Sequence, residues 1–199
     1  TFKLNYTFEN TPWDKEWQFL RTFEKECFVF GKDSLKIKST GDNIDMPGTP
    51  AFIGLHQKEF DMELSFTVTV LDGEAGLSIY MDEKHHYDLA LAKNNDGCSI
   101  MLKLNIGDIK HKQADVPLSR NKVSFRVRSN AANYSFFYCE GNNEISLGSA
   151  QTKYLSSEVA GNFTGVVLGF YSQDGLNNLF NEFTAFECNF TLAARTILY

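Results

Sequence analysis

Three acidic residues at alternate positions, Glu59, Asp61 and Glu63, have the types and spacing most suited to chemistry. Alternate side chains of a β-strand share one face, and two carboxyl groups about 5 Å apart can act as nucleophile and acid/base in glycoside hydrolysis. A flat strand would hold the backbones of Glu59 and Glu63 about 13 Å apart. Catalysis therefore requires a concave strand with converging side chains. The alternative is that the three residues form the solvated face of a half-buried strand.

The two tryptophans, Trp13 and Trp17, lie near the amino end. An indole ring can stack on a sugar ring or fill a core, so both residues are interpreted either as sugar platforms or as core. His85 and His86 are adjacent, and on a strand their side chains point to opposite faces, which does not suit one metal ion. The sequence contains no nucleophile elbow and no phosphate loop. A nucleophilic hydrolase and a nucleotide-dependent enzyme are therefore not expected. Since no Cys/His cluster has zinc spacing either, the sequence predicts no metal ligand set and no cofactor.

The 199 residues carry a formal charge of −6, and the 19 basic residues are scattered along the chain. Scattered basic residues do not form the positive stripe that contacts a phosphate backbone. No segment approaches the roughly 18 apolar residues that a membrane span needs. We therefore expect neither a nucleic acid nor a membrane as partner.

The four cysteines, Cys27, Cys98, Cys139 and Cys188, are widely spaced. They are interpreted as single buried thiols, with two disulfides as the alternative. The cysteine pattern does not decide between a cytoplasmic and a secreted protein.

Short segments in which apolar and polar residues alternate dominate the chain, and Gly, Asn and Asp separate them. In the clearest segment, residues 60–70, every even-numbered residue is apolar and every odd-numbered residue is polar. This period of two predicts a strand with one buried and one solvated face. The same pattern predicts strands at residues 75–81, 86–92, 99–104, 109–116, 123–128, 134–139, 144–147, 163–171 and 182–190.

No segment of helical length carries an apolar stripe at helical spacing. Many short strands with little helix predict an all-β fold, a two-sheet antiparallel jelly-roll sandwich. The 18 Phe residues suit the space between two such sheets. Since no linker interrupts the pattern, residues 1–199 are predicted to form a single β-sandwich domain.

Several stretches, in the same order and spacing, resemble the C-terminal concanavalin A-like β-sandwich domain of glycoside hydrolase family 43 β-xylosidases. The similarity extends from about Phe8 to Phe190, and the succession of stretches is more specific than any one of them. It is carried by residues 17–21 (WQFLR), 51–57 (AFIGLHQ), 60–63 (FDME), 74–77 (EAGL) with Tyr80, 86–87 (HY) and 161–171 (GNFTGVVLGFY).

The resemblance implies that the chain is the C-terminal part of a longer hydrolase and is itself non-catalytic. Family catalysis belongs to three carboxylates on a five-bladed propeller that precedes this domain. The implied partners are that propeller in cis and xylo- or arabino-oligosaccharides. In the β-xylosidases the sandwich lends an aromatic residue to the mouth of the active site, and the G-x-F-T-G motif makes Phe163 the candidate here. The alternative for Phe163 is an ordinary core position.

Two departures from the family pattern bear on the site. Leu55-His56-Gln57 stands where the family commonly has Arg-Arg-Gln, so interdomain ion pairs of those arginines are lost. Thr184 stands where the family usually has the second Asp of an Asp-Phe-Asp sequence. This substitution weakens a structural calcium site, which stays an alternative to the absence of any cofactor.

Three functions stay open from the sequence. The first is a non-catalytic accessory domain of a family 43-type β-xylosidase or arabinofuranosidase. The second is a free-standing carbohydrate-binding module with Trp13 or Trp17 as platform. The third is a jelly-roll β-glucanase that uses Glu59, Asp61 and Glu63.

Overall fold

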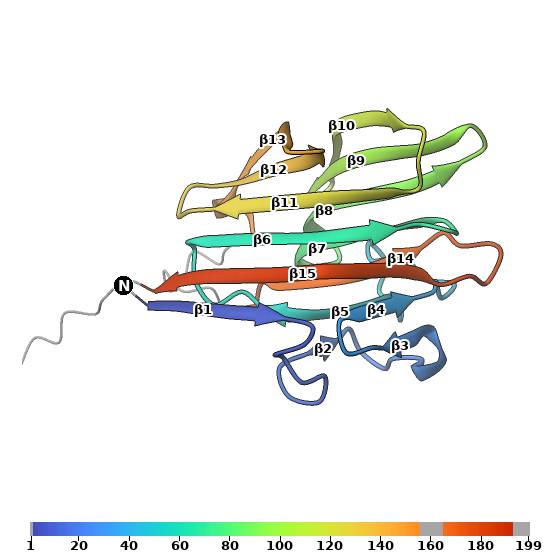
Figure 1. Ribbon diagram of the computed structural model, residues 1–199, viewed down its shortest axis with the longest axis horizontal. Coiled ribbons are helices and arrows are strands. Elements are labelled where there is room, and N and C mark those ends of the chain that lie inside the picture. The colour runs from blue at the N-terminus through green and yellow to red at the C-terminus, as the bar shows by residue number, and fades with distance from the viewer. Residues whose placement is uncertain (1, 156–164, 193–199) are drawn as a thin grey trace, which may run out of the picture.

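The computed structural model describes residues 2–155 and 165–192. In these ranges two antiparallel sheets face each other (Figure 1). The eight-stranded sheet has the order β13-β12-β11-β6-β15-β4-β3, and β1 also pairs with β15. The seven-stranded sheet has the order β10-β9-β8-β7-β14-β5-β2. The two-sheet all-β sandwich predicted from the sequence is confirmed.

The eight-stranded sheet contains β1 (Phe2–Thr7), β3 (Phe28–Phe30), β4 (Ser34–Ile37), β6 (Met62–Thr69), β11 (Lys122–Ser129), β12 (Asn133–Glu140), β13 (Asn143–Gln151) and β15 (Asn181–Leu192). The seven-stranded sheet contains β2 (Gln18–Phe19), β5 (Ala51–His56), β7 (Glu74–Asp82), β8 (His85–Asn94), β9 (Gly97–Ile106), β10 (Ile109–Leu118) and β14 (Val167–Gln173). The helices among the described residues are two short 3₁₀ turns, η1 (Lys25–Cys27) and η2 (Thr152–Tyr154). Neither is long and apolar enough to cross a membrane.

The alternation seen in the sequence places one face of each strand between the sheets. Along β6, Met62, Leu64 and Phe66 are buried, whereas Glu63 is exposed. The rings of the buried layer contact one another across the sandwich. Phe170 of β14 lies 5.4 Å from Phe66 of β6 and 4.9 Å from Phe183 of β15, measured between ring centroids. Aromatic packing between facing strands therefore joins the two sheets.

β5 is buried on both faces, which explains why alternation does not reveal it. Ile53 belongs to the core between the sheets, whereas Phe52 belongs to a second apolar cluster with Ile44. The Phe52 ring lies against Gly169 of β14, where an added Cβ would overlap that ring. A strand covered on both faces shows a continuous apolar run instead of alternation.

The cover on β5 is the segment of residues 38–50, here called the strap, which connects β4 of one sheet to β5 of the other. The Asn43 side-chain amide donates to Asp174 Oδ1 (2.9 Å), and the Ile44 backbone N–H donates to Gln173 Oε1 (3.2 Å). Ile44 is 1% exposed. The strap is therefore held against the outer face of the seven-stranded sheet.

Replacing Phe170 by alanine tests the packing of the aromatic layer. We expect Phe170→Ala to lower the free energy of unfolding by about 3–5 kcal/mol, because a buried ring is lost and a cavity remains. Urea unfolding measures the change. Phe2→Ala is the control, since Phe2 is 70% exposed and its loss should change the free energy by less than about 0.5 kcal/mol. Equal effects of the two substitutions would contradict the assignment of Phe170 to the core.

Candidate functional site

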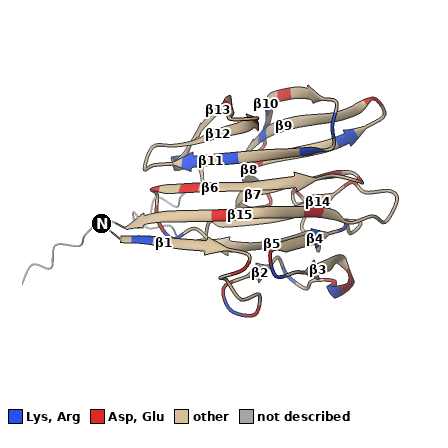
Figure 2. Cartoon of the chain, viewed as in Figure 1, with Lys and Arg blue, Asp and Glu red and all other residues tan. Residues whose placement is uncertain are grey.

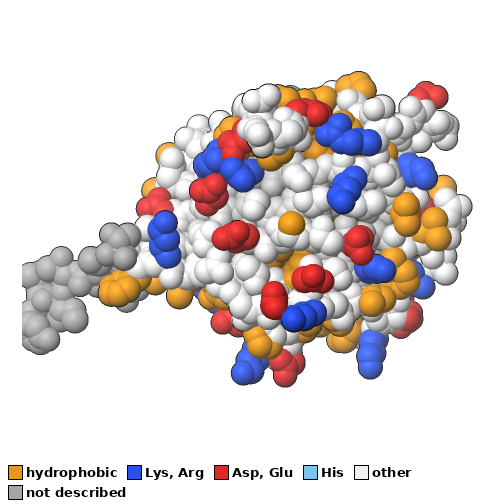
Figure 3. All heavy atoms as spheres, viewed as in Figure 1, with side chains coloured by type: hydrophobic (Ala, Val, Ile, Leu, Met, Phe, Trp, Pro, Cys, Tyr) orange, Lys and Arg blue, Asp and Glu red, His pale blue; other side chains and the backbone are white. Residues whose placement is uncertain are grey.

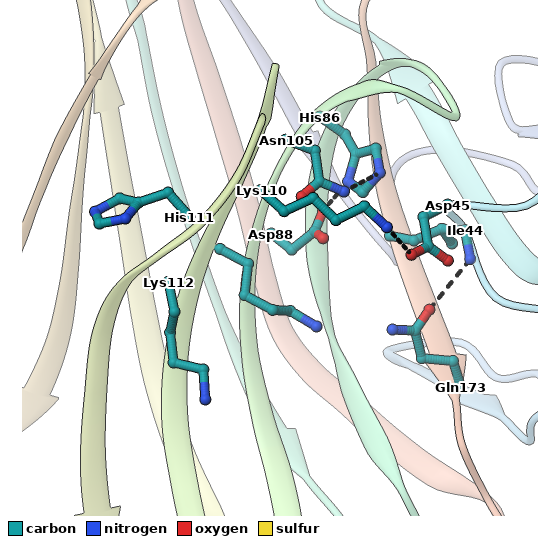
Figure 4. A pocket seen from close by; sticks show the side chains of 10 residues that line it. Ile44, Asp45, His86, Asp88, Asn105, Lys110, His111, Lys112 and Gln173 are labelled. Atoms are coloured by element: carbon teal, nitrogen blue, oxygen red, sulfur yellow. Dashed lines mark hydrogen bonds and ion pairs between the residues drawn. The ribbon is translucent and has the colours of Figure 1, made fainter. Parts of the chain in front are cut away.

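A polar pocket of about 270 Å³ lies on the outer face of the seven-stranded sheet, beside the strap (Figure 4). Its lining comes from β8, β9, β10, β14 and the strap. The lining residues are Ile44, Asp45, His86, Asp88, Lys103, Asn105, Lys110, His111, Lys112 and Gln173. His111 points away from the other labelled side chains in Figure 4, so the remaining residues form the pocket proper.

The strand register assembles the floor of the pocket in two rows that cross the sheet. Residues directly opposite one another on antiparallel strands have adjacent side chains. The first row pairs His86 with Asn105 and Asn105 with Lys110. The second row pairs Asp88 with Lys103 and Lys103 with Lys112. Polar residues that are distant in sequence thus become neighbours on one face.

His86 is the most buried titratable residue of the pocket, with 1% exposure. Its Nδ1 lies 2.7 Å from Asp88 Oδ1, and its Nε2 lies 2.9 Å from the Asn105 side-chain nitrogen. Burial alone would lower the pKa of His86. The charge of Asp88 and its hydrogen bond outweigh burial, with a smaller contribution from Asp45, so the pKa of His86 is raised above its usual value of 6.5.

Ser78 completes this cluster, but the arrangement is not a nucleophilic relay. Its hydroxyl donates to Asp88 Oδ1 (2.8 Å), the same oxygen that contacts His86. A serine nucleophile must instead donate its proton to the imidazole. Asp88 therefore orients two neighbours, and the cluster is built to hold fixed polar groups.

Lys103 forms the second buried ion pair of the pocket. Its Nζ lies 2.7 Å from Glu74 Oε1 and 2.8 Å from Oε2. The Tyr171 hydroxyl and the Gln173 amide also donate to Glu74 Oε2, at 2.7 and 3.0 Å. Burial would lower the pKa of Lys103, but the charges of Glu74 and Asp88 raise it. Lys103 is therefore held as a cation at a fixed position.

The strap closes one side of the pocket through an ion pair. Lys110 Nζ lies 3.0 Å from Asp45 Oδ2, and Figure 4 shows Lys110 extending across the floor towards the strap. Burial would raise the pKa of Asp45, but its hydrogen bond and charge interaction with Lys110 lower it. The carboxylate therefore stays ionised and ties the strap to β10.

The acidic triplet found in the sequence lies elsewhere. β6 begins at Met62, later than the predicted start at residue 60, so the strand carries Glu63 but neither Glu59 nor Asp61. Glu63 lies 3.8 Å from Arg126 Nε and 3.6 Å from an Arg128 nitrogen, on the outer face of the eight-stranded sheet. Asp61 and Glu63 are both exposed on either side of the buried Met62, whereas Glu59 is half-buried and lies before the strand.

That face carries charges of both signs. Figure 2 shows acidic positions on β6 and basic positions on β11, and Figure 3 shows these charges interspersed with uncharged surface. Arg126 and Arg128 of β11 both form ion pairs with Glu144 of β13. Glu63 is thus part of a charge network on the surface, and such networks contribute little energy for each pair.

The two tryptophans lie in the aromatic core. Trp17 is 7% exposed and its Nε1 donates to the Thr11 carbonyl (3.2 Å). Trp13 is half-buried, donates to the Gly31 carbonyl (3.0 Å), and lies 4.7 Å from the Trp17 ring. Trp17 is therefore a core residue, whereas Trp13 packs against the core and remains partly exposed.

Three further expectations concern Phe163, the cysteines and metal ions. Phe163 lies outside the described residues. Cys27, Cys98, Cys139 and Cys188 are free thiols, as predicted, but only the first, second and fourth are buried and Cys139 is partly exposed. In the described part of the chain, no three or more His, Cys, Asp or Glu residues are arranged to hold a metal ion.

The two sheets and their strand order define a β-sandwich. Comparison with known proteins identifies the family of this β-sandwich. The sequence model of the beta xylosidase C-terminal concanavalin A-like domain matches residues 5–188. The chain belongs to this family, which confirms the resemblance found in the sequence and the concanavalin A-like fold.

Named relatives are carbohydrate-active enzymes. The chain is 29% identical to the non-reducing end α-L-arabinofuranosidase BoGH43B of Bacteroides ovatus, over 86% of this chain and 32% of the relative. It is 22% identical to a xylosidase/arabinosidase of Butyrivibrio fibrisolvens, over 86% of this chain and 35% of the relative. The chain thus spans about a third of the length of these relatives.

Solved structures show the same fold. The xyloglucan-locus protein GH43B of Bacteroides ovatus matches with a TM-score of 0.77 and 26% identity, over 94% of this chain and 39% of that one. A functionally unknown protein from Saccharomyces cerevisiae matches with a TM-score of 0.64 and 10% identity, over 89% of this chain and 98% of that one. The fold therefore occurs both within longer chains and as nearly a whole chain.

The raised pKa of His86 makes a prediction about stability. Protonated His86 stabilises the fold below its unfolded-state pKa of about 6.5, and this contribution is lost as the pH rises through the higher folded-state pKa. We expect His86→Gln to lower the free energy of unfolding by more at about pH 5.5 than at about pH 8.5. Urea unfolding at both pH values measures the difference.

Asp88→Asn is the matched control for the cause of the shift. Burial of His86 persists in this variant while the neighbouring charge is removed, so the imidazole pKa should fall below that of the parent protein. An NMR titration of the His86 ring measures it. An unchanged pKa in Asp88→Asn would contradict the role given to Asp88.

Proposed function

We propose that the chain is a non-catalytic accessory domain of a family 43-type β-xylosidase or arabinofuranosidase, which packs on a catalytic propeller and shapes the mouth of its active site. The observation that carries the proposal is the family match over residues 5–188 to a β-xylosidase C-terminal domain. The chain spans 32% and 35% of two enzyme relatives. The remaining length of such an enzyme is ample for a separate catalytic domain.

The chemistry of the described residues supports a non-catalytic role. Glu63 is engaged by Arg126 and Arg128, and Ser78 donates to a carboxylate instead of an imidazole. A retaining glycosidase needs two free carboxyl groups about 5 Å apart. Neither cluster offers that arrangement, which favours catalysis by another domain.

An exposed aromatic edge supports docking of another domain. β2 and β3 each end a sheet, and they lie on the same side of the sandwich in Figure 1. Phe23 and Phe30 remain 40% and 38% exposed there. Phe19 stacks on Phe23 with ring centroids 3.8 Å apart and contacts Phe28 through its edge. A contiguous apolar surface of this kind is typical of interdomain contacts.

A free-standing carbohydrate-binding module is the second candidate. Two observations favour this candidate. One is the yeast structure of this fold, of which 98% of the length is matched. The other is the polar pocket beside the strap. This candidate differs from the first in one respect that can be measured, since it needs no catalytic domain in the same polypeptide.

Phe163→Ala tests the contribution to the active-site mouth. In the intact polypeptide we expect kcat/KM for aryl xylosides or arabinofuranosides to fall about two- to tenfold, mainly through KM, because a stacking ring contributes about 0.5–1.5 kcal/mol. Steady-state kinetics measures the change. Phe163→Tyr keeps a ring at this position and should retain most of the activity. Unchanged kinetics in Phe163→Ala would contradict the role.

A further inference from the structure

We propose that the pocket on the seven-stranded sheet binds one uncharged sugar unit, with recognition through its hydroxyl groups. This proposal does not depend on docking to a catalytic domain, because every residue that lines the pocket belongs to this chain. The pocket does not include Trp13 or Trp17, which the sequence analysis considered as sugar platforms.

The size of the pocket suits a single ring. Its volume of about 270 Å³ lies just below the range of drug-sized ligand sites, which is roughly 300–1,000 Å³. The strap limits the pocket on one side, where Lys110 of β10 pairs with Asp45. A longer oligosaccharide would have to leave the pocket after one unit.

The charges of the pocket argue for an uncharged ligand. Each lysine that lines it already has a carboxylate partner: Lys103 has Glu74 at 2.7 Å, Lys110 has Asp45 at 3.0 Å, and Lys112 has Asp115 at 3.2 Å. His86 is likewise paired with Asp88. A ligand with its own negative charge would have to compete with these partners, so the pocket does not attract anions strongly.

Both hydrogen-bond donors and hydrogen-bond acceptors remain available in the pocket. Lys103 uses two of its three N–H groups on Glu74. Asp88 Oδ2 and the amide atom of Asn105 that does not contact His86 make no hydrogen bond with the described residues, although both residues line the pocket. Sugar hydroxyls both donate and accept, so a polyhydroxyl ligand can use ammonium donors and carboxylate or amide acceptors together.

The groups that would contact the sugar are held in place before binding. Asp88 is fixed by Ser78 and His86, and the Asn105 side chain by His86. The strap is fixed through Gln173, whose Oε1 accepts a hydrogen bond from the Ile44 backbone N–H. Preorganised polar groups lose little conformational freedom when a ligand binds. The pocket therefore has the rigidity that hydroxyl recognition requires.

Chemical-shift perturbation in the 199-residue chain tests the proposal. The probes are L-arabinose, D-xylose, D-galactose and D-glucose as uncharged sugars, with D-glucuronate and inorganic phosphate as anions. We expect at least one uncharged sugar to shift the backbone amides of His86, Asp88, Lys103 and Asn105 in a saturable way. Neither anion should bind more tightly than that sugar.

Substitutions in the pocket locate the binding. Asn105→Ala and Lys110→Met should each weaken binding at least about fivefold, as expected for one lost hydrogen bond to a ligand. Asn133→Ala on β12 and Lys122→Met on β11 are the matched controls and should change the affinity less than twofold. Lys110 has a 65% exposed side chain, so its variant is expected to fold even if Asn105→Ala does not.

Three results would overturn the proposal. They are no saturable shift with any uncharged sugar, tighter binding of glucuronate or phosphate than of every uncharged sugar, and equal affinity of Lys110→Met and the parent protein. None of them bears on whether a catalytic domain is joined to the chain, so failure of the pocket and failure of the accessory role are distinguishable.

Discussion

The packing of aromatic rings between the two sheets is the constraint on which the rest of the structure depends. Phe66, Phe170 and Phe183 meet across the sandwich and fix which side of each strand faces inward. Because side chains alternate along a strand, fixing the inner face also fixes the outer one. A shift of β8 or β9 by one residue would move His86 or Asn105 into the core and dismantle the pocket.

Because the core fixes which side chains face outward, the outer face of the seven-stranded sheet can carry a polar pocket. The strap covers part of that face with Ile44 and leaves the rest as a polar pocket, in which ions are paired and polar groups are held by neighbours. Burial beneath the strap raises the cost of an unpaired charge, and the pairing of His86 with Asp88 and of Lys103 with Glu74 offsets that cost. The pocket is therefore close to neutral, and its polar groups are held in fixed positions.

Much of the fold could be predicted from the sequence, because half-buried strands such as β6 alternate visibly. β5 could not, since the strap covers its outer face and the run from Ala51 to Leu55 is buried throughout. β2 has two residues and is too short to show a period. The pocket was missed for another reason. His86 and Asp88 alternate with apolar residues as a solvated face would, and only the strap and the register with β9 make them a buried cluster.

The mass of the native polypeptide tests the accessory role most directly. Immunoblotting of the source material with an antibody raised against this chain measures it. The account predicts a species far heavier than the 22.6 kDa of the chain, because it proposes a catalytic domain in the same polypeptide. A species near 22.6 kDa would contradict the accessory role and would favour a free-standing module.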